Sequence, residues 1–411
     1  MKGFFLIIPF FLLITASNAQ NNSLDYYVNQ AIQNSPLLRD YQNQKLIAQY
    51  DSLLIRAAYK PQVTGSSINS YAPVINGYGY DQAITNGGNF NALIGVNKAL
   101  LNKKVVRVQF DSLQLQNQFL DNSYRISEQD LKKTVIAQYI TAYGSLLQLN
   151  FNTELSALLS KEEVILKKAT EKNVYRQVDY LAFLVTLKQQ NLSLKQLTIQ
   201  YKNDLATLNY LSGITDTAVI DLQYPDIRSM QLPDLATSPF LKKFEIDSLK
   251  LSNRKNLLDM SYKPKFNVFA DAGFNSTLAY QAYKNFGTSF GFSVVIPIYD
   301  GKQKKLQYSK LAIEESTRLN YRSFFIAQYK QQIAQLNQQL QATEELINDI
   351  NAELKYAQAL IDTNGKLLET GEVKITDYIL ALNNFLNAQN LLKQNNISRL
   401  QLINQINYWN R

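Results

Sequence analysis

The two residue types most versatile in catalysis and metal binding are absent from this sequence: its 411 residues include no histidine and no cysteine. Zinc sites of the usual Cys/His kind, thiol nucleophiles and serine–histidine catalytic pairs are therefore ruled out. No pair of acidic residues is accompanied by the signs of a pocket, so we expect neither an enzyme nor a cofactor or resident metal. The remaining candidates are basic clusters and single aspartates.

Two basic clusters occupy corresponding places, each just after a strand-like segment. They consist of Lys103, Lys104 and Arg107 in the first half and of Lys302, Lys304 and Lys305 in the second. Cations beside a bilayer can pair with lipid phosphates and fix the depth of a membrane-embedded element. The alternative is a solvated first turn of a helix that binds nothing.

The first residues predict a secretory signal peptide, residues 1–19. Lys2 gives a cationic start, an apolar stretch runs from Phe4 to Ile14, and Ala19 is a small residue suited to cleavage. The stretch is shorter than the ~20 residues that a membrane-spanning helix needs, and no later run reaches that length. We therefore expect an exported protein without a transmembrane helix. Its net charge of +9 would suit nucleic acid, which an exported chain rarely meets.

Proline placement shows where long helices can form. The nine prolines leave residues 74–224 and all residues after 297 free of proline, which costs ~3 kcal/mol or more inside a helix. Apolar residues recur there at helical spacing. The segment DTNGKLLETGE predicts a helix over 302–364, a C-cap at Gly365 and then the tip of a helical hairpin. The corresponding tip in the first half is expected near KATEKNVYRQ, residues 168–177.

The chain also repeats itself. SPLLRDYQ at 35–42 matches SPFLKKFE at 238–245, and YKP at 59–61 matches YKP at 262–264, both with an offset of 203. VDYLA at 178–182 matches TDYIL at 376–380, and NYL at 209–211 matches NYW at 407–409, both with an offset of 198. Two constant offsets predict two copies of one helix-strand-strand-long helix-helix unit, 24–213 and 238–411, joined by a linker at 214–237.

The strand-like segments alternate apolar with small or polar residues, although QVTGSSINSY at 62–71 fits poorly. The large apolar residues predicted to share one face, and to face lipid, are Phe90, Ile94, Phe266, Val268, Phe286, Phe290, Phe292 and Val294. Such strands of ~9–11 residues are typical of a transmembrane β-barrel. The alternative, a soluble sandwich, would need a second sheet that the sequence does not predict. Four strands cannot close a barrel, so several chains would share one, and three chains would supply twelve strands.

Taken together, these features resemble the outer-membrane efflux protein family, the TolC-like channels, over about 24–411. The motifs that carry the resemblance are SVVIPIYDGKQKK at 293–305, the two YKP elements, and GEVKITDYILALNNFLNAQ at 371–389. The resemblance implies a mainly α protein with a transmembrane β part: a homotrimer whose 12-stranded β-barrel lies in the outer membrane of a Gram-negative bacterium. A long α-helical tunnel would continue the barrel through the periplasm.

The resemblance further implies a passive exit duct of a tripartite efflux or type I secretion system. A periplasmic adaptor (membrane fusion) protein and an inner-membrane pump would open its periplasmic end. A function of another class is a non-pore periplasmic coiled-coil adaptor or scaffold. Adaptors usually carry lipoyl-like or β-barrel domains rich in glycine and valine, which are not evident in this sequence.

Family gate positions map onto the helical hairpin tips. Asp377 matches an aspartate that lines the constricted entrance, and Asp179 is its repeat partner, whereas the family's second aspartate and a common gate arginine fall at Leu380 and Val373. The gate therefore departs from the family pattern there. Three copies of Asp377 around an axis would form a carboxylate ring that attracts cations and raises the pKa of its members. The alternative is a solvated carboxylate that the helix dipole favours.

Overall fold

The computed structural model describes residues 22–81, 88–100, 103–230, 235–277 and 282–409. The predicted signal peptide lies outside the described residues. The chain forms two compact units, and each takes segments from both halves of the sequence. Among the described residues, those within Met1–Ser35, Gln129–Gln231 and Ile333–Asn410 form the helical unit, and those within Pro36–Glu128 and Leu232–Gln332 form the sheet unit.

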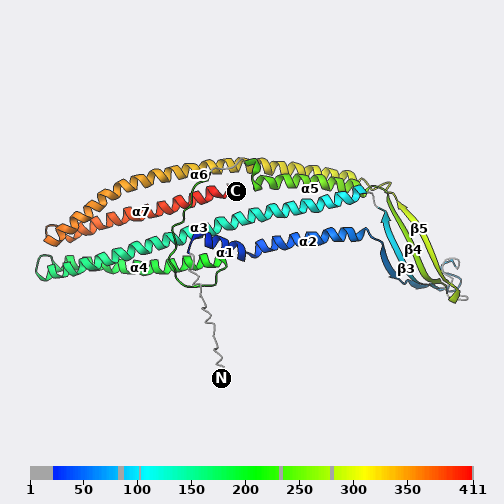
Figure 1. Cartoon of the computed structure of the whole chain (residues 1–411), viewed down its shortest axis with the longest axis horizontal. Helices are drawn as coiled ribbons and strands as arrows, with labels where there is room; N and C mark the ends of the chain where they lie inside the picture. The colour runs from blue at the N-terminus through cyan, green and yellow to red at the C-terminus, as the bar shows by residue number, and fades with distance from the viewer. Residues whose placement is uncertain (1–21, 82–87, 101–102, 231–234, 278–281, 410–411) are drawn as a thin grey trace, which may run out of the picture. The chain divides into compact units, whose positions relative to one another are not determined.

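The sheet unit is built on one antiparallel sheet. Its strands are β1 (Gln62–Ser66), β2 (Asn69–Tyr71), β3 (Gly88–Leu100), β4 (Lys265–Ser276) and β5 (Phe286–Val295). The order is β1-β3-β4-β5, and β2 also pairs with β3. The three longer strands, β3, β4 and β5, are labelled in Figure 1. The predicted polar strand at 62–71 is therefore present but interrupted.

A single residue of β3 explains the interruption of the edge strand. The side-chain oxygen of Asn91 accepts a hydrogen bond from the backbone N–H of Ile68 at 2.8 Å, and its carbonyl accepts one from the Ser67 hydroxyl at 2.8 Å. These bonds replace part of the regular ladder. β1 and β2 keep one continuous register along β3, so they form one edge strand with a local break.

Four helices continue from the sheet. They are α2 (Pro36–Ala58), α3 (Lys103–Glu171), α5 (Pro239–Ser261) and α6 (Gln303–Thr370). Their packing follows the strand order. Lys45 of α2 pairs with Asp121 of α3 at 2.6 Å, Asn122 of α3 donates to the Pro239 carbonyl of α5 at 2.9 Å, and Arg254 of α5 pairs with Glu314 of α6 at 3.1 Å. In the sheet unit, α2 and α6 are thus the outer helices of a row.

The helical unit contains α1 (Leu24–Asn34), α4 (Gln177–Ser212), α7 (Ile375–Tyr408) and the distal parts of α3 and α6. One core cluster brings α1, α3, α4 and the segment after α4 together around buried tyrosines. The hydroxyl of Tyr139 donates to the carbonyl of Asn22 or of Gln223, at 2.7 and 2.8 Å. It therefore joins α3 to the segment before α1 and to the segment after α4. A second cluster surrounds Phe183 and Leu382 near the hairpin ends.

Two helix boundaries differ from the sequence-based expectation. The predicted C-cap at Gly365 is wrong, because α6 continues to Thr370 and the turn is made at Gly371, which has φ 82°. A glycine inside a helix costs only about 1 kcal/mol, which packing can outweigh. The first helix is divided at Ser35, because Pro36 has no N–H to continue the helical hydrogen bonds. The first hairpin turn falls as predicted, between Glu171 and Gln177.

Among the helices in the described part of the chain, none is both long enough and apolar enough to cross a membrane.

Candidate functional sites: the apolar sheet face and the helical hairpin ends

The strand register places the predicted apolar residues on one face of the sheet. Phe266 lies opposite Val294, and Val268 lies opposite Phe292, while Ile94 lies opposite Ala272 on the other side of β4. Side chains directly opposite each other in an antiparallel pair point to the same face. Phe90 of β3 and Phe286 and Phe290 of β5 belong to this set as well. The sequence alternation was therefore sufficient to assign the face.

This apolar face is largely uncovered in the single chain. The exposed fractions reach 89% for Phe290, 77% for Phe292 and 64% for Ile94. Only Phe90 of the predicted set is half-buried. A soluble monomer rarely exposes an apolar patch of this kind, so the face must meet another apolar phase or another protein. A soluble sandwich is disfavoured, because no second sheet is found among the described residues.

The opposite face of the sheet is polar. The Ser289 hydroxyl donates to the Asp271 carboxylate at 2.7 Å, and the two residues are directly opposite in the β4–β5 register. Gly273 has φ 154°, and a Cβ there would lie 2.1 Å from the Ala92 carbonyl oxygen, so only glycine fits. The sheet therefore has one face suited to lipid and one suited to water.

The strand-to-helix junction of the second half is tied together by side chains. Asp300 accepts a hydrogen bond from the backbone N–H of Lys304 at 2.7 Å and so caps the start of α6, and Tyr262 of the YKP motif also bonds Asp300. Lys304 pairs with Asp259 at 3.2 Å, and the Tyr308 hydroxyl donates to the same carboxylate. The hydrogen bond from Tyr308, followed by that from Lys304, holds the pKa of Asp259 below its usual range.

The members of the predicted basic clusters therefore differ in their surroundings. Lys304 has a partner within the chain, whereas Lys302 and Lys305 are exposed. In the first half, the side chains are all exposed at the start of α3; they are Lys103, Lys104 and Arg107. The exposed cations could contact an anionic surface, and Lys304 instead holds α6 against α5.

The first helical hairpin end joins α3 to α4. Asp179, in the first turn of α4, receives two hydrogen bonds from the Arg176 guanidinium: Nε to Oδ2 at 2.9 Å and Nη2 to Oδ1 at 3.0 Å. The guanidinium lowers the pKa of Asp179, and the charge of Lys374 adds a smaller effect in the same direction. This aspartate is therefore neutralised within its own hairpin end.

The second helical hairpin end joins α6 to α7 and leaves its aspartate open. Asp377 occupies the first turn of α7, and its side chain is exposed. Within the described part of the chain, its carboxylate forms no ion pair or hydrogen bond. Leu380, one turn further on, is 61% exposed, whereas Val373 packs against the second core cluster. Val373 is thus a packing residue in this chain.

A tyrosine joins the two hairpin ends. The hydroxyl of Tyr175 lies 2.7 Å from the carbonyl oxygen of Leu368 and 3.2 Å from that of Val373. The last carbonyls of a helix have no partner within the helix. The carbonyl of Leu368 accepts from the backbone N–H of Gly371 at 3.3 Å, and Tyr175 adds a second, shorter hydrogen bond. Val174 lies beside Gly371, where a Cβ would approach its Cγ1 to 2.8 Å.

Comparisons with solved structures decide the fold. The channel protein CusC matches with a TM-score of 0.76 and 14% identity, over 95% of this chain and 92% of that chain. VceC, an outer membrane protein of Vibrio cholerae, matches with a TM-score of 0.74 and 13% identity, over 94% of this chain and 96% of that chain. The Campylobacter jejuni CmeC outer membrane channel matches with a TM-score of 0.73 and 13% identity, over 94% of this chain and 85% of that chain.

The chain has the fold of the TolC-like outer-membrane efflux channels. The identities of 13–14% are too low to carry more than the fold. Neither a family model nor a curated protein matches the sequence.

Within this TolC-like fold, two tyrosines make contacts that the sequence does not predict. Tyr262 lies in a YKP motif that was noticed as a repeat, but nothing in the sequence revealed its bond to Asp300, 38 residues later in the chain. Tyr175 gave no signal beyond its place in a predicted turn. Asp300 could have been found as a helix-start signal, because an aspartate shortly before a long helical pattern can accept a hydrogen bond from a backbone N–H of the first turn.

Proposed function

We propose that the chain is an outer-membrane exit duct, a passive conduit of a tripartite efflux or type I secretion system. The observation that carries the proposal is the exposed apolar face of the sheet, on a chain with the fold of outer-membrane channels. Lipid would cover this face, and the polar face with Asp271 and Ser289 would line a water-filled lumen.

The duct is proposed to be a homotrimer with one shared barrel. One chain supplies four rows of strands and leaves the outer edges of β1 and β5 unpaired within the described sheet. An open sheet edge is not tolerated in hydrocarbon, because its N–H and C=O groups would have no partner. Three copies give twelve strands and close the sheet, a size found among membrane barrels.

The two proposed sequence repeats, 24–213 and 238–411 with the linker 214–237, fit this assembly. Each repeat would supply two neighbouring rows of strands in the sheet and one helical hairpin. The correspondence of α2 with α5, of α3 with α6 and of α4 with α7 supports the duplication. The exposed basic residues at the starts of α3 and α6 would then lie beside the inner-leaflet headgroups.

The helical hairpin ends are proposed to form the periplasmic entrance, with Asp377 at its narrowest ring. Three exposed carboxylates around an axis would favour cations and disfavour anions. Asp179 would stay in the supporting wall, where Arg176 already neutralises it. An adaptor (membrane fusion) protein and an inner-membrane pump would open the entrance, and the duct itself would need no cofactor.

The mass of the detergent-extracted particle tests the proposal. The outer-membrane fraction of cells that express the full chain is extracted, and the particle is measured by native mass spectrometry. A trimer is expected, and it should form channels in planar bilayers. A water-soluble monomer would contradict the duct and leave a periplasmic coiled-coil protein.

A further inference from the structure

A groove of about 660 Å³ lies between α5 and α6 in the sheet unit. Its volume is within the ~300–1,000 Å³ that is usual for small-molecule sites in proteins. The lining combines two lysines and two arginines with aromatic side chains, which are Phe244, Tyr321, Phe324 and Phe325. A ligand that fits this lining has an apolar part and an anionic part.

The aromatic side chains leave apolar surface open to the groove. Tyr321 is 66% exposed and Phe324 is 60% exposed, and both lie on α6. Phe244 and Phe325 join the two helices, with their ring centroids 5.8 Å apart. Apolar area that a ligand removes from water contributes ~25 cal/mol per Å² to binding. The apolar part of a ligand would therefore be stabilised on Tyr321 and Phe324.

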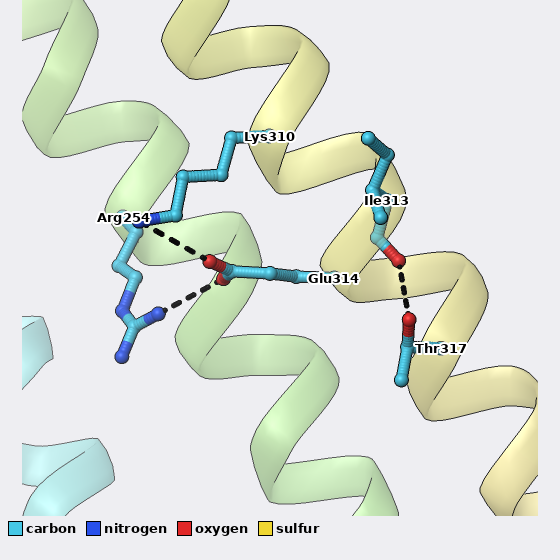
Figure 2. A network of polar contacts seen from close by, with 5 residues as sticks. All are labelled: Arg254, Lys310, Ile313, Glu314 and Thr317. Atoms are coloured by element: carbon cyan, nitrogen blue, oxygen red, sulfur yellow. Dashed lines mark hydrogen bonds and ion pairs between the residues drawn. The ribbon is translucent and has the colours of Figure 1, made fainter.

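An ion pair occupies the charged groups at the end of the groove nearer the sheet. In Figure 2, Arg254 of α5 and Lys310 of α6 both approach the carboxylate of Glu314, at 3.1 and 3.9 Å. The hydroxyl of Thr317, which also lines the groove, donates to the Ile313 carbonyl of its own helix at 2.9 Å (Figure 2). The polar groups at this end are therefore paired within the chain.

Arg318, the second arginine of the lining, is also paired. Its Nε and Nη2 donate to the two carboxylate oxygens of Glu315 at 2.7 and 2.6 Å, and its Nη1 donates to the Phe244 carbonyl at 3.0 Å. These bonds use both arms of the guanidinium. Arg318 therefore holds α6 on α5 and does not supply the charge for a ligand.

The two lysines of the lining, both on α5, have no such partner. Within the described residues, neither Lys243 nor Lys250 forms an ion pair or a hydrogen bond. Lys250 is half-buried, and its ammonium lies 3.5 Å from the ring centroid of Phe119 of α3. Burial lowers the pKa of Lys250, an effect that the charge of Asp247 partly offsets and that of Arg254 increases. A cation partly removed from water without a bound anion costs free energy, which an anionic ligand would recover.

The spacing of the lysines sets the charge balance of the groove. Lys243 and Lys250 are seven residues apart, which is two helical turns, so they lie on one side of α5. Asp247 lies between them on the same side and lines the groove as well. One carboxylate thus stands beside two ammonium groups, and the excess positive charge suits one anionic group.

We propose that this groove binds a monoanionic amphiphile. Its anionic group lies between Lys243 and Lys250, and its apolar body covers Tyr321 and Phe324. The site goes beyond the proposed duct and does not depend on it, because every lining residue belongs to the sheet unit of one chain. Neutral amphiphiles lack the balancing charge, and a small anion such as phosphate lacks the apolar body.

Tryptophan fluorescence tests the site, since the chain has one tryptophan of its own. In the full chain, Trp409→Phe removes that signal, and Tyr321→Trp places a reporter in the groove. Leu319→Trp, on the same background, is the matched control, because Leu319 is 47% exposed on α6 but does not line the groove. Tyr321 lies ~27 Å along α6 from its first residue, Gln303, so a probe dissolved in a bilayer does not reach the reporter.

The probes are para-bromophenylbutanoate, whose bromine quenches tryptophan on contact, and the neutral alcohol of the same shape. They are titrated onto the chain in phosphatidylcholine nanodiscs. The acid should quench the Tyr321→Trp reporter at about tenfold lower concentration than the alcohol, the factor that one charge-assisted hydrogen bond supplies. Quenching of Leu319→Trp should be weak with both probes.

Three lysine variants assign the preference to the groove. Lys250→Gln should remove most of the preference for the acid, whereas Lys250→Arg keeps the charge and should retain it. Lys250→Gln also loses the contact with Phe119, so the exposed Lys243→Gln is the second test and should reduce the preference without a change in packing.

Equal quenching by acid and alcohol, or equal quenching of the Leu319→Trp control, overturns the site. Inorganic phosphate that displaces the acid as well as unbrominated phenylbutanoate does overturns the amphiphile and leaves an anion site only. If the chain is a water-soluble monomer, the same titration is made in buffer, so failure of the duct and failure of this site are distinguishable.

Discussion

The two helical hairpin ends carry an aspartate at the same place, the third residue of the returning helix, yet the two carboxylates have different surroundings. Asp179 is held by both arms of the Arg176 guanidinium. Lys374 stands before α7 as Arg176 stands before α4, but no ion pair joins it to Asp377 within the described residues. The guanidinium fork fits a carboxylate at two points, whereas an ammonium is a single point charge. One residue type thus decides whether the charge remains available.

The hairpin ends also differ in which one supports the other. Tyr175, from the first end, reaches across to the carbonyls of Leu368 and Val373 in the second. The residue at the matching place in the second end is Val373, which has no polar atom in its side chain. The first end therefore supports the second and has its aspartate paired, whereas the second presents an open carboxylate. The proposed role of Asp377 in ion selection depends on this difference.

The largest effect should follow from removing the open carboxylate. Asp377→Ala is expected to lower the cation-over-anion selectivity of the channel several-fold, because it removes the charge that proposed trimers present at the entrance. Removing the whole ion pair, Asp179→Ala together with Arg176→Ala, should leave selectivity nearly unchanged, since the two charges compensate each other. Reversal potentials in planar bilayers under a salt gradient measure both variants.

Asp377→Asn is the matched control, because it keeps the size of the side chain and removes only the charge. It should reproduce the selectivity of Asp377→Ala. Equal losses for the Asp179 and Asp377 variants would contradict the comparison, because the ion pair would then not screen Asp179 from the lumen.

A second, smaller effect concerns the turn that supports Asp377. Gly371→Ala should destabilise the second hairpin end by about 1–2 kcal/mol, the cost of a left-handed backbone for a residue with a Cβ. The new Cβ would also lie 2.8 Å from Val174. Gly365→Ala is the control and should stabilise by about 0.5–1 kcal/mol, because Gly365 is helical. Its Cβ would only touch the Tyr378 ring at 3.7 Å.

Hydrogen exchange of the backbone amides of residues 366–376 measures this pair of variants. Exchange there should become faster in Gly371→Ala and slower in Gly365→Ala. Faster exchange in both variants would mean that Gly365 is needed as a helix end, as the sequence alone had indicated.

The glycine pair shows where sequence reasoning reached its limit. Both glycines lie in DTNGKLLETGE, and a helix-ending glycine cannot be told from a helical one by local sequence. The outcome depends on Leu368, which is buried in the second core cluster and holds the last turn of α6 in place. Strand faces were easier to predict, because alternation is a local property and the register of β3, β4 and β5 follows it.

For the candidate sites too, local features could be predicted from the sequence and long-range contacts could not. The positions of Asp179 and Asp377 in the first turns of α4 and α7 follow from the repeat, and the structure has them there. Their different charge environments do not follow, because the Arg176 contact depends on side-chain geometry. The partner of Lys304 was equally hidden, since Asp259 lies on another helix. Long-range pairing of polar side chains leaves no periodic trace in a sequence.

The smallest effect should come from breaking the ion pair of the first hairpin end. Arg176 holds the pKa of Asp179 below its ordinary value, so the folded state binds that proton less readily than the unfolded state. The resulting stabilisation is present above the unfolded pKa, about 3.9 for an aspartate, and is lost as the pH falls through the lower folded pKa. Arg176→Ala should therefore lower the melting temperature slightly at pH 7, and the difference should disappear once the pH lies below the folded pKa of Asp179. Lys374→Ala, measured in the same series of melting curves, should show a smaller difference, because its charge contributes less to the Asp179 shift. A loss for Arg176→Ala that persists unchanged in acid would mean that the arginine acts through packing and not through its charge.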